Sequence, residues 1–281
     1  MALSDDLIQA SRAKVLILDI ETQRAITEVW TTYKPFITID NVIVDARVLC
    51  FAAKWRGKDK VIFKSCWRDP VSVNGRNEDA EQEYRQMMQA AWDLLNECDI
   101  LVTYNGDRFD WQWLEREFTR LGMARPLPYR SQDLMKVNKK WFKAGQLSLK
   151  LDWSLRKLLG ESKIAHGGVD LWHEIRYGSA KERRAACKAM REYNIHDARK
   201  TEQLFEHWLP YLPLNMALYG DRLAADDGLL HCTKCDSTNL HRQEGAFVRT
   251  GAYGYQLYRC VDCGAVSRGK RSKITTELRP V

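Results

Sequence analysis

The sequence predicts an α/β protein in which a mixed β-sheet is flanked by helices, with a small β-rich region towards the C-terminal end. Three observations lead to this prediction. Short apolar runs alternate with amphipathic helical stretches through residues 14–208, and this order is typical of the α/β class. The composition changes near residue 222. Beyond that point, four cysteines stand in two C-x-x-C pairs among β-favouring residues.

Four segments are predicted to be strands. Each is a short run of β-branched and apolar residues, and they cover residues 14–20, 47–55, 60–67 and 99–105. Residues 57–59, Gly-Lys-Asp, predict a hairpin turn between the second and third strands. Residues 23–46 are too apolar for a linker, but their pattern assigns them no element.

Helices are predicted from apolar residues that recur at helical spacing. In residues 78–97 the apolar face consists of Tyr84, Met87, Met88, Ala91, Leu94 and Leu95. Further helices are expected over 110–121, near 149–160 and over 180–208. Residues 220–230, GDRLAADDGLL, have little to bury and predict a boundary between a domain at 1–220 and a second domain at 221–281 with a basic tail.

The composition is that of a globular chain. Of 281 residues, 45% are hydrophobic and 10% aromatic, so disorder is excluded for most of the chain. No run of 18 uncharged apolar residues occurs, and the N-terminal stretch has two Asp residues and no apolar signal region. We therefore expect a cytoplasmic protein with no membrane partner.

The charge balance is positive and unevenly distributed. Lys and Arg number 44 against 37 Asp and Glu, which gives a net charge of +7. The excess concentrates in residues 130–163, 176–191 and 264–281. Solvated helix faces would explain any one of these runs, but the three together favour a surface that follows phosphates.

Two carboxylates stand at the end of the first predicted strand. Asp19 and Glu21 are two positions apart, and because side chains alternate along a strand, both lie on one face of the sheet. Such a pair is costly unless a cation or hydrogen bonds compensate it. A metal site is one interpretation, and a strand end that has reached solvent is the other.

Two later segments add residues of the same kind. In TYNGDRFDW (103–111), a strand runs into an Asn105–Gly106 turn and Asp110 stands at the start of a helix, where an N-cap would also explain it. In EYNIHDARKTE (192–202), Tyr193 and Asp197 are four residues apart and share a helix face. Each signal alone also fits a structural role.

Taken in order, D-x-E, N-G-x-x-F-D and Y-x-x-x-D resemble the three motifs of the DEDD-type 3′–5′ exonucleases of the RNase H-like superfamily, in the tyrosine branch. TYNGDRFDW is similar to the second motif of the proofreading exonuclease of family B DNA polymerases. The whole chain, with its ending YQLYRCVDCGAVSR, resembles phage and bacterial exonucleases that carry a C-terminal zinc ribbon. The resemblance implies an RNase H-like mixed sheet and, for a phage-encoded chain, a location in the host cytoplasm.

The resemblance also implies hydrolysis of phosphodiester bonds with two Mg²⁺ or Mn²⁺ ions, which prefer oxygen ligands. Asp19 would bridge both ions, and Asp110 would support the second one. Glu21 and Asp197 would hold the ion that activates water. Tyr193 would orient that water, because the ordinary pKa of a phenol, about 10, disfavours proton abstraction.

Substrate contacts are expected from two other groups of residues. Asn105 and Phe109 are candidates for the terminal nucleotide, although Phe109 also fits the core. Trp141 lies beside Lys139 and Lys140 in a basic and aromatic mixture suited to unpaired bases. Packing under an amphipathic helix is the alternative for Trp141.

The paired cysteines predict a structural zinc site. Cys232, Cys235, Cys260 and Cys263 have the spacing of a four-cysteine ribbon. The expected absence of export argues against disulfides. His231 is a less favoured ligand. The ribbon is expected to contact nucleic acid or to dock a replication or repair protein.

The sequence therefore predicts a metal-dependent 3′–5′ exonuclease acting on DNA, with single-stranded 3′ ends as substrate. A 3′–5′ exoribonuclease on the same fold and a non-catalytic nucleic-acid-binding adaptor are the alternatives. The presence of all four acidic residues and of Tyr193 argues against the adaptor.

Overall fold

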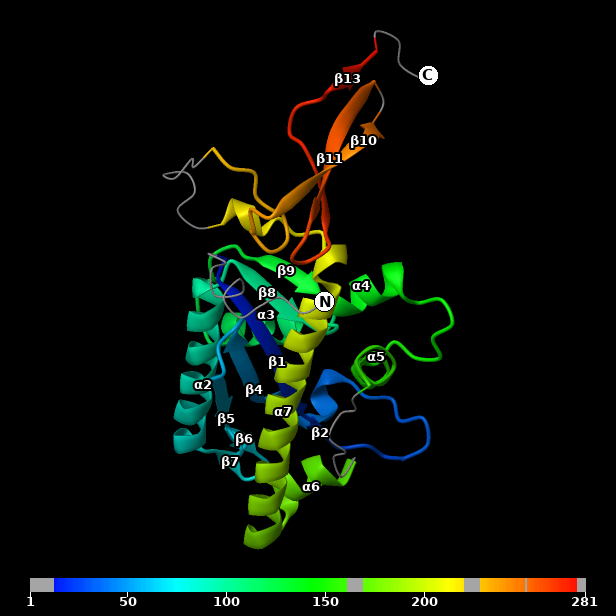
Figure 1. Cartoon of the computed structure of the whole chain (residues 1–281). Helices are drawn as coiled ribbons and strands as arrows, with labels where there is room; N and C mark the ends of the chain where they lie inside the picture. The colour runs from blue at the N-terminus through cyan, green and yellow to red at the C-terminus, as the bar shows by residue number, and fades with distance from the viewer. Residues whose placement is uncertain (1–12, 161–168, 220–227, 251, 277–281) are drawn as a thin grey trace. The chain divides into compact units, whose positions relative to one another are not determined.

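The computed structural model describes residues 13–160, 169–219, 228–250 and 252–276 (Figure 1). It divides into two compact units, one formed by Lys14–Glu202 and one that contains the chain from Gln203 onward. The predicted domain boundary at residues 220–221 lies outside the described residues.

The first unit is built on a five-stranded mixed sheet in the order β5-β4-β1-β8-β9. Its strands are β1 (Val15–Gln23), β4 (Arg47–Trp55), β5 (Val61–Ser65), β8 (Ile100–Thr103) and β9 (Arg130–Asp133). β4 is antiparallel to both of its neighbours, whereas β8 and β9 continue the sheet parallel to β1. The four predicted strands are confirmed, and the predicted hairpin turn joins β4 to β5 with Gly57 at a φ of 70°.

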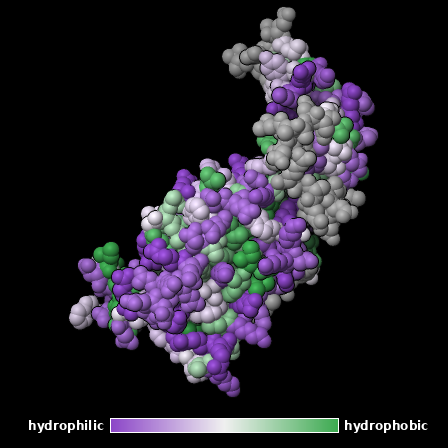
Figure 2. All heavy atoms as spheres, turned by 90° about the vertical axis from the view of Figure 1, so that its left-hand side faces the viewer, coloured by the Kyte–Doolittle hydropathy of each residue, from purple (hydrophilic) through white to green (hydrophobic). Residues whose placement is uncertain are grey.

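One face of the sheet is covered by α2 (Glu78–Glu97) and α3 (Asp110–Arg120). Leu16, Leu18 and Ile20 of β1 pack there against the predicted apolar face of α2, which is buried as expected. The outer side of α2 is exposed, and the surface drawn in Figure 2 is mostly hydrophilic. α2 is therefore the amphipathic helix that the sequence predicts.

The opposite face is covered by α6 (Val169–Tyr177) and α7 (Ala180–Trp208). Leu49 and Cys50 of β4 pack there against these two helices. Asp19 and Glu21 alternate with the residues that point to α2, so they lie on this second face. Glu21 pairs in register with Cys50, whose side chain packs in the α6–α7 cluster, so Glu21 points to the same face.

The predicted helix over 180–208 is confirmed as α7, but the stretch near 149–160 differs from a regular helix. It consists of α5 (Leu151–Ser154) and a π-helical turn over Leu155–Leu159, which ends at Gly160 with a φ of 68°. α4 (Leu134–Trp141) and α6 were not predicted. α4 has only eight residues, too few for its apolar spacing to stand out.

Residues 23–46 form a short two-stranded sheet with an exposed apolar tip. β2 (Ile26–Thr27) pairs with β3 (Val42–Val44), and the 3₁₀ turn η1 (Ile39–Asn41) precedes β3. Trp30 is fully exposed, and Tyr33 and Phe36 are nearly so. A second small ladder pairs β6 (Val71–Ser72) with β7 (Gly75–Arg76).

The second unit contains a β-sheet and two short 3₁₀ turns, η3 (Leu209–Tyr211) and η4 (Met216–Leu218). Its strands are β10 (Leu240–Thr250), β11 (Tyr253–Cys260), β12 (Val266–Arg268) and β13 (Ile274–Thr275). β11 is central and pairs antiparallel with the other three. This confirms the β-rich region that the sequence predicts. Within the described segments, no helix has the length and apolarity needed to cross a bilayer.

Candidate active site and cysteine cluster

Asp110 lies directly against β1, at the residue that separates Asp19 from Glu21 in the sequence. Its Oδ1 accepts a hydrogen bond of 3.0 Å from the backbone N–H of Ile20, which stands between Asp19 and Glu21. Asp110 is only 3% exposed. Burial raises the pKa of this carboxyl to about 7, against the opposing effect of the Ile20 N–H. The structure therefore brings the first two motifs together.

The turn before Asp110 explains how its side chain reaches β1. After β8, Asn105 adopts a φ of 70°, and Gly106 follows it. A Cβ on Gly106 would lie 2.1 Å from the Thr103 Oγ1, so only glycine fits here. Asp110 is the first residue of α3 and Phe109 is the N-cap, so the alternative interpretation of Asp110 as an N-cap is wrong.

The third motif meets β1 through Asn194. The Asn194 Nδ2 donates to Asp19 Oδ2 at 2.6 Å and to the Asp19 carbonyl oxygen at 3.1 Å. Asn194 is fully buried, and Asp197, three residues further along α7, is 2% exposed. Asn194 was not predicted, because nothing in the pattern of α7 alone marks an amide whose partner lies 175 positions away.

Cys50 completes this contact from β4. Its thiol lies 3.8 Å from the Asn194 Oδ1 and can donate a weak hydrogen bond to it. Burial raises the pKa of Cys50, and the charges of Glu21 and Asp19 raise it further. The thiol therefore stays protonated, and the Asn194 amide is held with its N–H₂ group towards Asp19.

Asp133 is a further buried carboxylate that the sequence analysis did not single out. It ends β9, beside the carboxyl end of β8. Its Oδ1 accepts from the backbone N–H of Asn105 at 2.9 Å and caps α4 through Met135 at 2.8 Å. Burial raises its pKa, and its charge contributes to the raised pKa of Asp110. Asp133 thus fixes the turn that precedes Asp110.

Tyr193 lies on the α7 face that packs on the sheet. It is 8% exposed and contacts the cluster that contains Leu49, Cys50 and Met190. It precedes Asn194, the residue that binds Asp19. Its ring is thus held in place by apolar packing close to the first motif.

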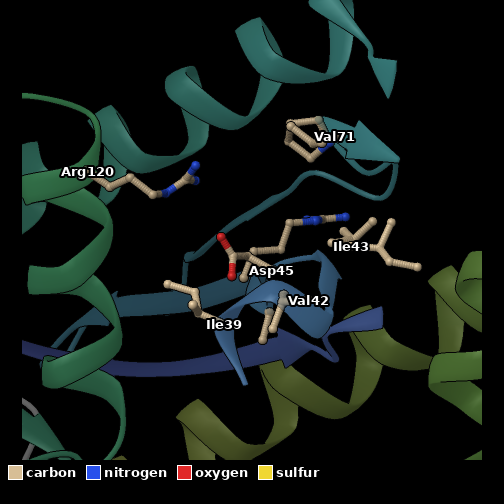
Figure 3. A pocket seen from close by; sticks show the side chains of 10 residues that line it. Ile39, Val42, Ile43, Asp45, Val71 and Arg120 are labelled. Carbon is tan, nitrogen blue, oxygen red and sulfur yellow. The ribbon is translucent and has the colours of Figure 1, made fainter. Parts of the chain in front are cut away.

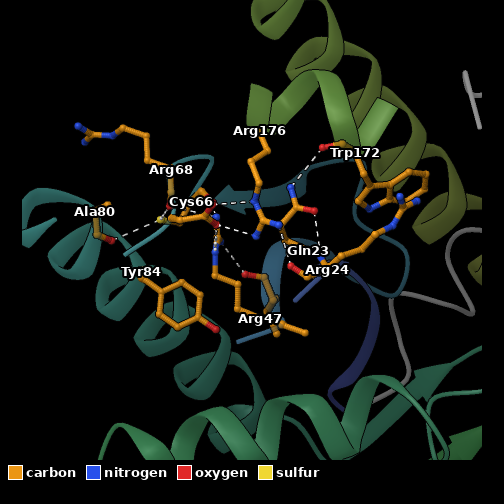
Figure 4. A network of polar contacts seen from close by, with 12 residues as sticks. Gln23, Arg24, Arg47, Cys66, Arg68, Ala80, Tyr84, Trp172 and Arg176 are labelled. Atoms are coloured by element: carbon orange, nitrogen blue, oxygen red, sulfur yellow. Dashed lines mark hydrogen bonds and ion pairs between the residues drawn. The ribbon is translucent and has the colours of Figure 1, made fainter. Parts of the chain in front are cut away.

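A buried ionic network fixes α6 to the end of β1 (Figure 4). Asp69 accepts from Arg47 Nε at 3.0 Å and from Arg176 Nε at 2.7 Å. Arg176 also donates to the Arg24 carbonyl oxygen, and Trp172 donates from its indole to the Thr22 carbonyl oxygen. These bonds anchor the strand just beyond Glu21, which limits how far its carboxylate can move.

The predicted substrate contacts are accessible. Phe109 is 36% exposed and makes an edge contact with Trp113, so it does not belong to the core. Trp141 ends α4 and is 52% exposed, with the Lys140 Nζ 4.9 Å from its ring centroid. Lys139 is exposed as well. About half of the Trp141 side chain is thus open to solvent.

A pocket of about 240 Å³ lies elsewhere, at the far end of α3 (Figure 3). Its apolar walls include Ile39, Ile43 and Val71. The charged residues that line it are Asp45, Arg47 and Arg120. None of the predicted catalytic residues lines it.

The four cysteines of the second unit converge. The Sγ atoms of Cys232, Cys235, Cys260 and Cys263 all lie within 4.8 Å of one another, and all four residues are buried. Among the residues that the structure describes, no cluster of carboxylates is this compact. Four close sulfurs are the donor set that zinc prefers. The cluster in its β-rich surroundings is consistent with a zinc ribbon.

The local backbone has the form of two metal knuckles. The backbone N–H of Lys234 points at the Cys232 Sγ, at 3.4 Å. The residue after each second cysteine has a positive φ, 68° at Asp236 and 74° at Gly264. The His231 Nδ1 lies 3.0 Å from the Asp236 carbonyl oxygen, outside the four-sulfur group. N–H···S contacts of this kind stabilise metal-bound thiolates.

A mixed sheet with two carboxylates on one face of its central strand is the architecture of an RNase H-like nuclease. The chain matches the RNase_H_2 family of the RNase H superfamily over residues 61–209, more than half of its length, and it belongs to that superfamily. No curated protein matches it. RNase H-like nucleases use divalent metal ions, and membership indicates a nucleic-acid substrate. The match includes Asp110, Tyr193 and Asp197 but begins after Asp19 and Glu21.

Proposed function

We propose that the protein is a 3′–5′ exonuclease that removes nucleotides from single-stranded DNA ends by a two-metal-ion mechanism. The observation that supports this most is the Ile20–Asp110 hydrogen bond, which joins the second motif to the first. The Asn194–Asp19 bonds do the same for the third motif. Residues of the second and third motif segments thus contact β1 at Asp19 and Ile20, within the first motif.

Asp19, Glu21, Asp110 and Asp197 are the residues that would hold two Mg²⁺ or Mn²⁺ ions, because clustered carboxylates supply the oxygen donors that these ions prefer. The ions would activate water and neutralise charge on the phosphate. The chain's own part is to present the oxygens. Asn194 fixes the Asp19 carboxylate, and Asp110 must lose the proton that burial favours before it can bind a cation.

Tyr193 is proposed to orient the attacking water. We expect Tyr193→Phe to lower kcat by about 100-fold, because one positioning hydroxyl is lost, and to leave Mn²⁺ affinity unchanged. Single-turnover hydrolysis and calorimetric Mn²⁺ titration measure the two effects. An unchanged single-turnover rate would show that Tyr193 only packs in the cluster with Leu49, Cys50 and Met190.

Asn194 is proposed to position Asp19. Asn194→Ala removes both hydrogen bonds to Asp19, so we expect Mn²⁺ to bind about 10-fold more weakly, as for other partners of metal ligands. Met190→Ala is the control, because it truncates a buried side chain in the α7 cluster that has no amide to donate to Asp19. Equal Mn²⁺ affinity in both variants and the wild type would contradict the positioning role.

The proposed activity is tested with 5′-labelled single-stranded DNA and RNA of equal sequence, incubated with the protein and Mn²⁺. Degradation from the 3′ end gives a ladder of shortening labelled products, whereas the opposite polarity releases a labelled mononucleotide at once. Preference for RNA would replace DNA as the substrate. An intact substrate in both lanes would favour the adaptor, provided that the protein binds the oligonucleotides.

A further inference from the structure

The sheet of the second unit has two unlike faces. Along β11, Gly254, Gln256 and Cys260 are buried, whereas the alternating residues Tyr253 and Arg259 are exposed. Side chains of a strand point alternately to either face, so one face of the sheet is covered and the other is open.

The register of the neighbouring strands extends the open face. Arg268 of β12 pairs with Leu257, and His241 of β10 pairs with Arg259, so both point to the same side as their partners. We define the open face by the residues Tyr253, Tyr255, Leu257, Arg259, Arg268 and His241. By the same register, Arg249 pairs with Gly254 and points to the opposite face, where its own side chain is exposed.

The aromatic rings and one guanidinium of the open face are in contact. The ring centroids of Tyr253 and Tyr255 lie 6.4 Å apart. The Arg268 Cζ lies 4.2 Å from the centroid of the Tyr255 ring, so the guanidinium stacks on it. Aromatic rings and arginine planes are the surfaces on which unpaired bases stack in single-stranded nucleic acids.

The charge of this unit suits a polyanion. Residues 228–276 contain eight Lys and Arg residues against three acidic ones. Asp236 and Asp262 belong to the cysteine knuckles, where Asp262 accepts from Asn239 at 3.0 Å. The third, Glu244, pairs with Arg242. Among the described residues, the open face thus carries two arginines and no carboxylate.

We propose that the open face binds single-stranded nucleic acid, with bases stacked on Tyr253 and Tyr255 and phosphates paired with Arg259 and Arg268. A peptide partner is less favoured, because an acidic peptide would use the arginines but would leave the stacked rings without planar partners. The open face contains none of the carboxylates proposed for catalysis. Binding to it therefore does not require that the protein hydrolyses the nucleic acid.

The test measures binding of a fluorescent 20-nucleotide oligothymidylate by anisotropy, in the full-length Asp110→Asn background, with a gel to show that the oligonucleotide stays intact. We expect the double variant Tyr253→Ala/Tyr255→Ala to bind at least about 10-fold more weakly. Tyr253→Phe/Tyr255→Phe keeps the rings and is expected to bind within about twofold of the parent. Zinc content reports that each variant retains its fold.

The arginines are tested by salt dependence. Arg268→Ala should reduce the slope of log affinity against log salt by about 1, the value for one phosphate contact. Arg249→Ala is the matched control, an exposed arginine on the opposite face, and should leave the slope unchanged. The proposal would be overturned if Arg268→Ala and Arg249→Ala changed the salt slope equally. It would also be overturned if the double alanine variant kept its zinc and its affinity for the oligonucleotide, and the open face would then be assigned to a protein partner.

Failure of the proposed function would be visible separately. Hydrolysis of a tetranucleotide by the protein with intact carboxylates reports the active site alone, and the open-face variants are expected to leave it unchanged. Loss of binding with retained hydrolysis supports the second site, and loss of hydrolysis with retained binding refutes only the nuclease proposal.

Discussion

Asp110→Asn is expected to reduce nuclease activity by on the order of 10³-fold or more, because a neutral amide replaces a carboxylate that would hold a metal ion. The substitution keeps an oxygen that can accept the Ile20 N–H bond, so the turn and α3 should remain in place. Asp19→Ala is expected to have an effect of the same order. Single-turnover degradation of labelled DNA in Mn²⁺ measures both.

The same variant is expected to be more stable than the wild type in the absence of metal. The folded-state pKa of Asp110 is raised to about 7, so the folded protein holds this proton more tightly than the unfolded chain does. The wild-type protein therefore loses folding stability as pH rises from about 4 towards 7. The gain from Asp110→Asn should be small near pH 4 and reach on the order of 4 kcal/mol at pH 8. Urea unfolding in EDTA-free, metal-depleted buffer at several pH values measures it.

Asp93→Asn provides the control for both experiments, since Asp93 is an exposed acidic residue of α2 bonded to Gln89. It should change neither activity nor the pH dependence of stability. Activity of Asp110→Asn close to that of Asp93→Asn would remove Asp110 from the site.

Much of the fold followed from local patterns in the sequence. The apolar face of α2 was predicted residue by residue because helical spacing over 20 residues leaves little ambiguity. The β4–β5 hairpin was predictable from its turn residues. α4 and α6 were not predicted, because helices of eight and nine residues are too short for their apolar spacing to stand out.

The candidate site shows the same division. The carboxylates could be singled out because their three motifs, taken in order along the chain, resemble those of a known class of exonucleases. Asn194 and Asp133 could not, because each acts through contacts with residues remote in sequence: Asn194 binds Asp19 across 175 positions. Without the position of β1, nothing distinguishes Asn194 from an asparagine that only stabilises its helix.

The second large effect concerns the cysteine cluster. Cys232→Ser/Cys235→Ser is expected to abolish zinc binding and to unfold the β10–β13 sheet, while the five-stranded sheet of the first unit keeps its secondary structure. The ribbon buries few large apolar side chains among the residues that the structure describes, so metal must supply much of its folding energy, about 10 kcal/mol for comparable structural zinc sites.

Cys187→Ser is the matched control, because Cys187 is a half-buried thiol of α7 outside the four-sulfur group. Atomic absorption should find about one zinc per chain in the wild type and in this control, and almost none in the double variant. Limited proteolysis should then cut the double variant beyond residue 228 and spare the first unit. A wild-type protein without zinc would refute the ribbon assignment. A protease-resistant double variant would show that the β10–β13 sheet folds by its own packing and that zinc contributes little to its stability.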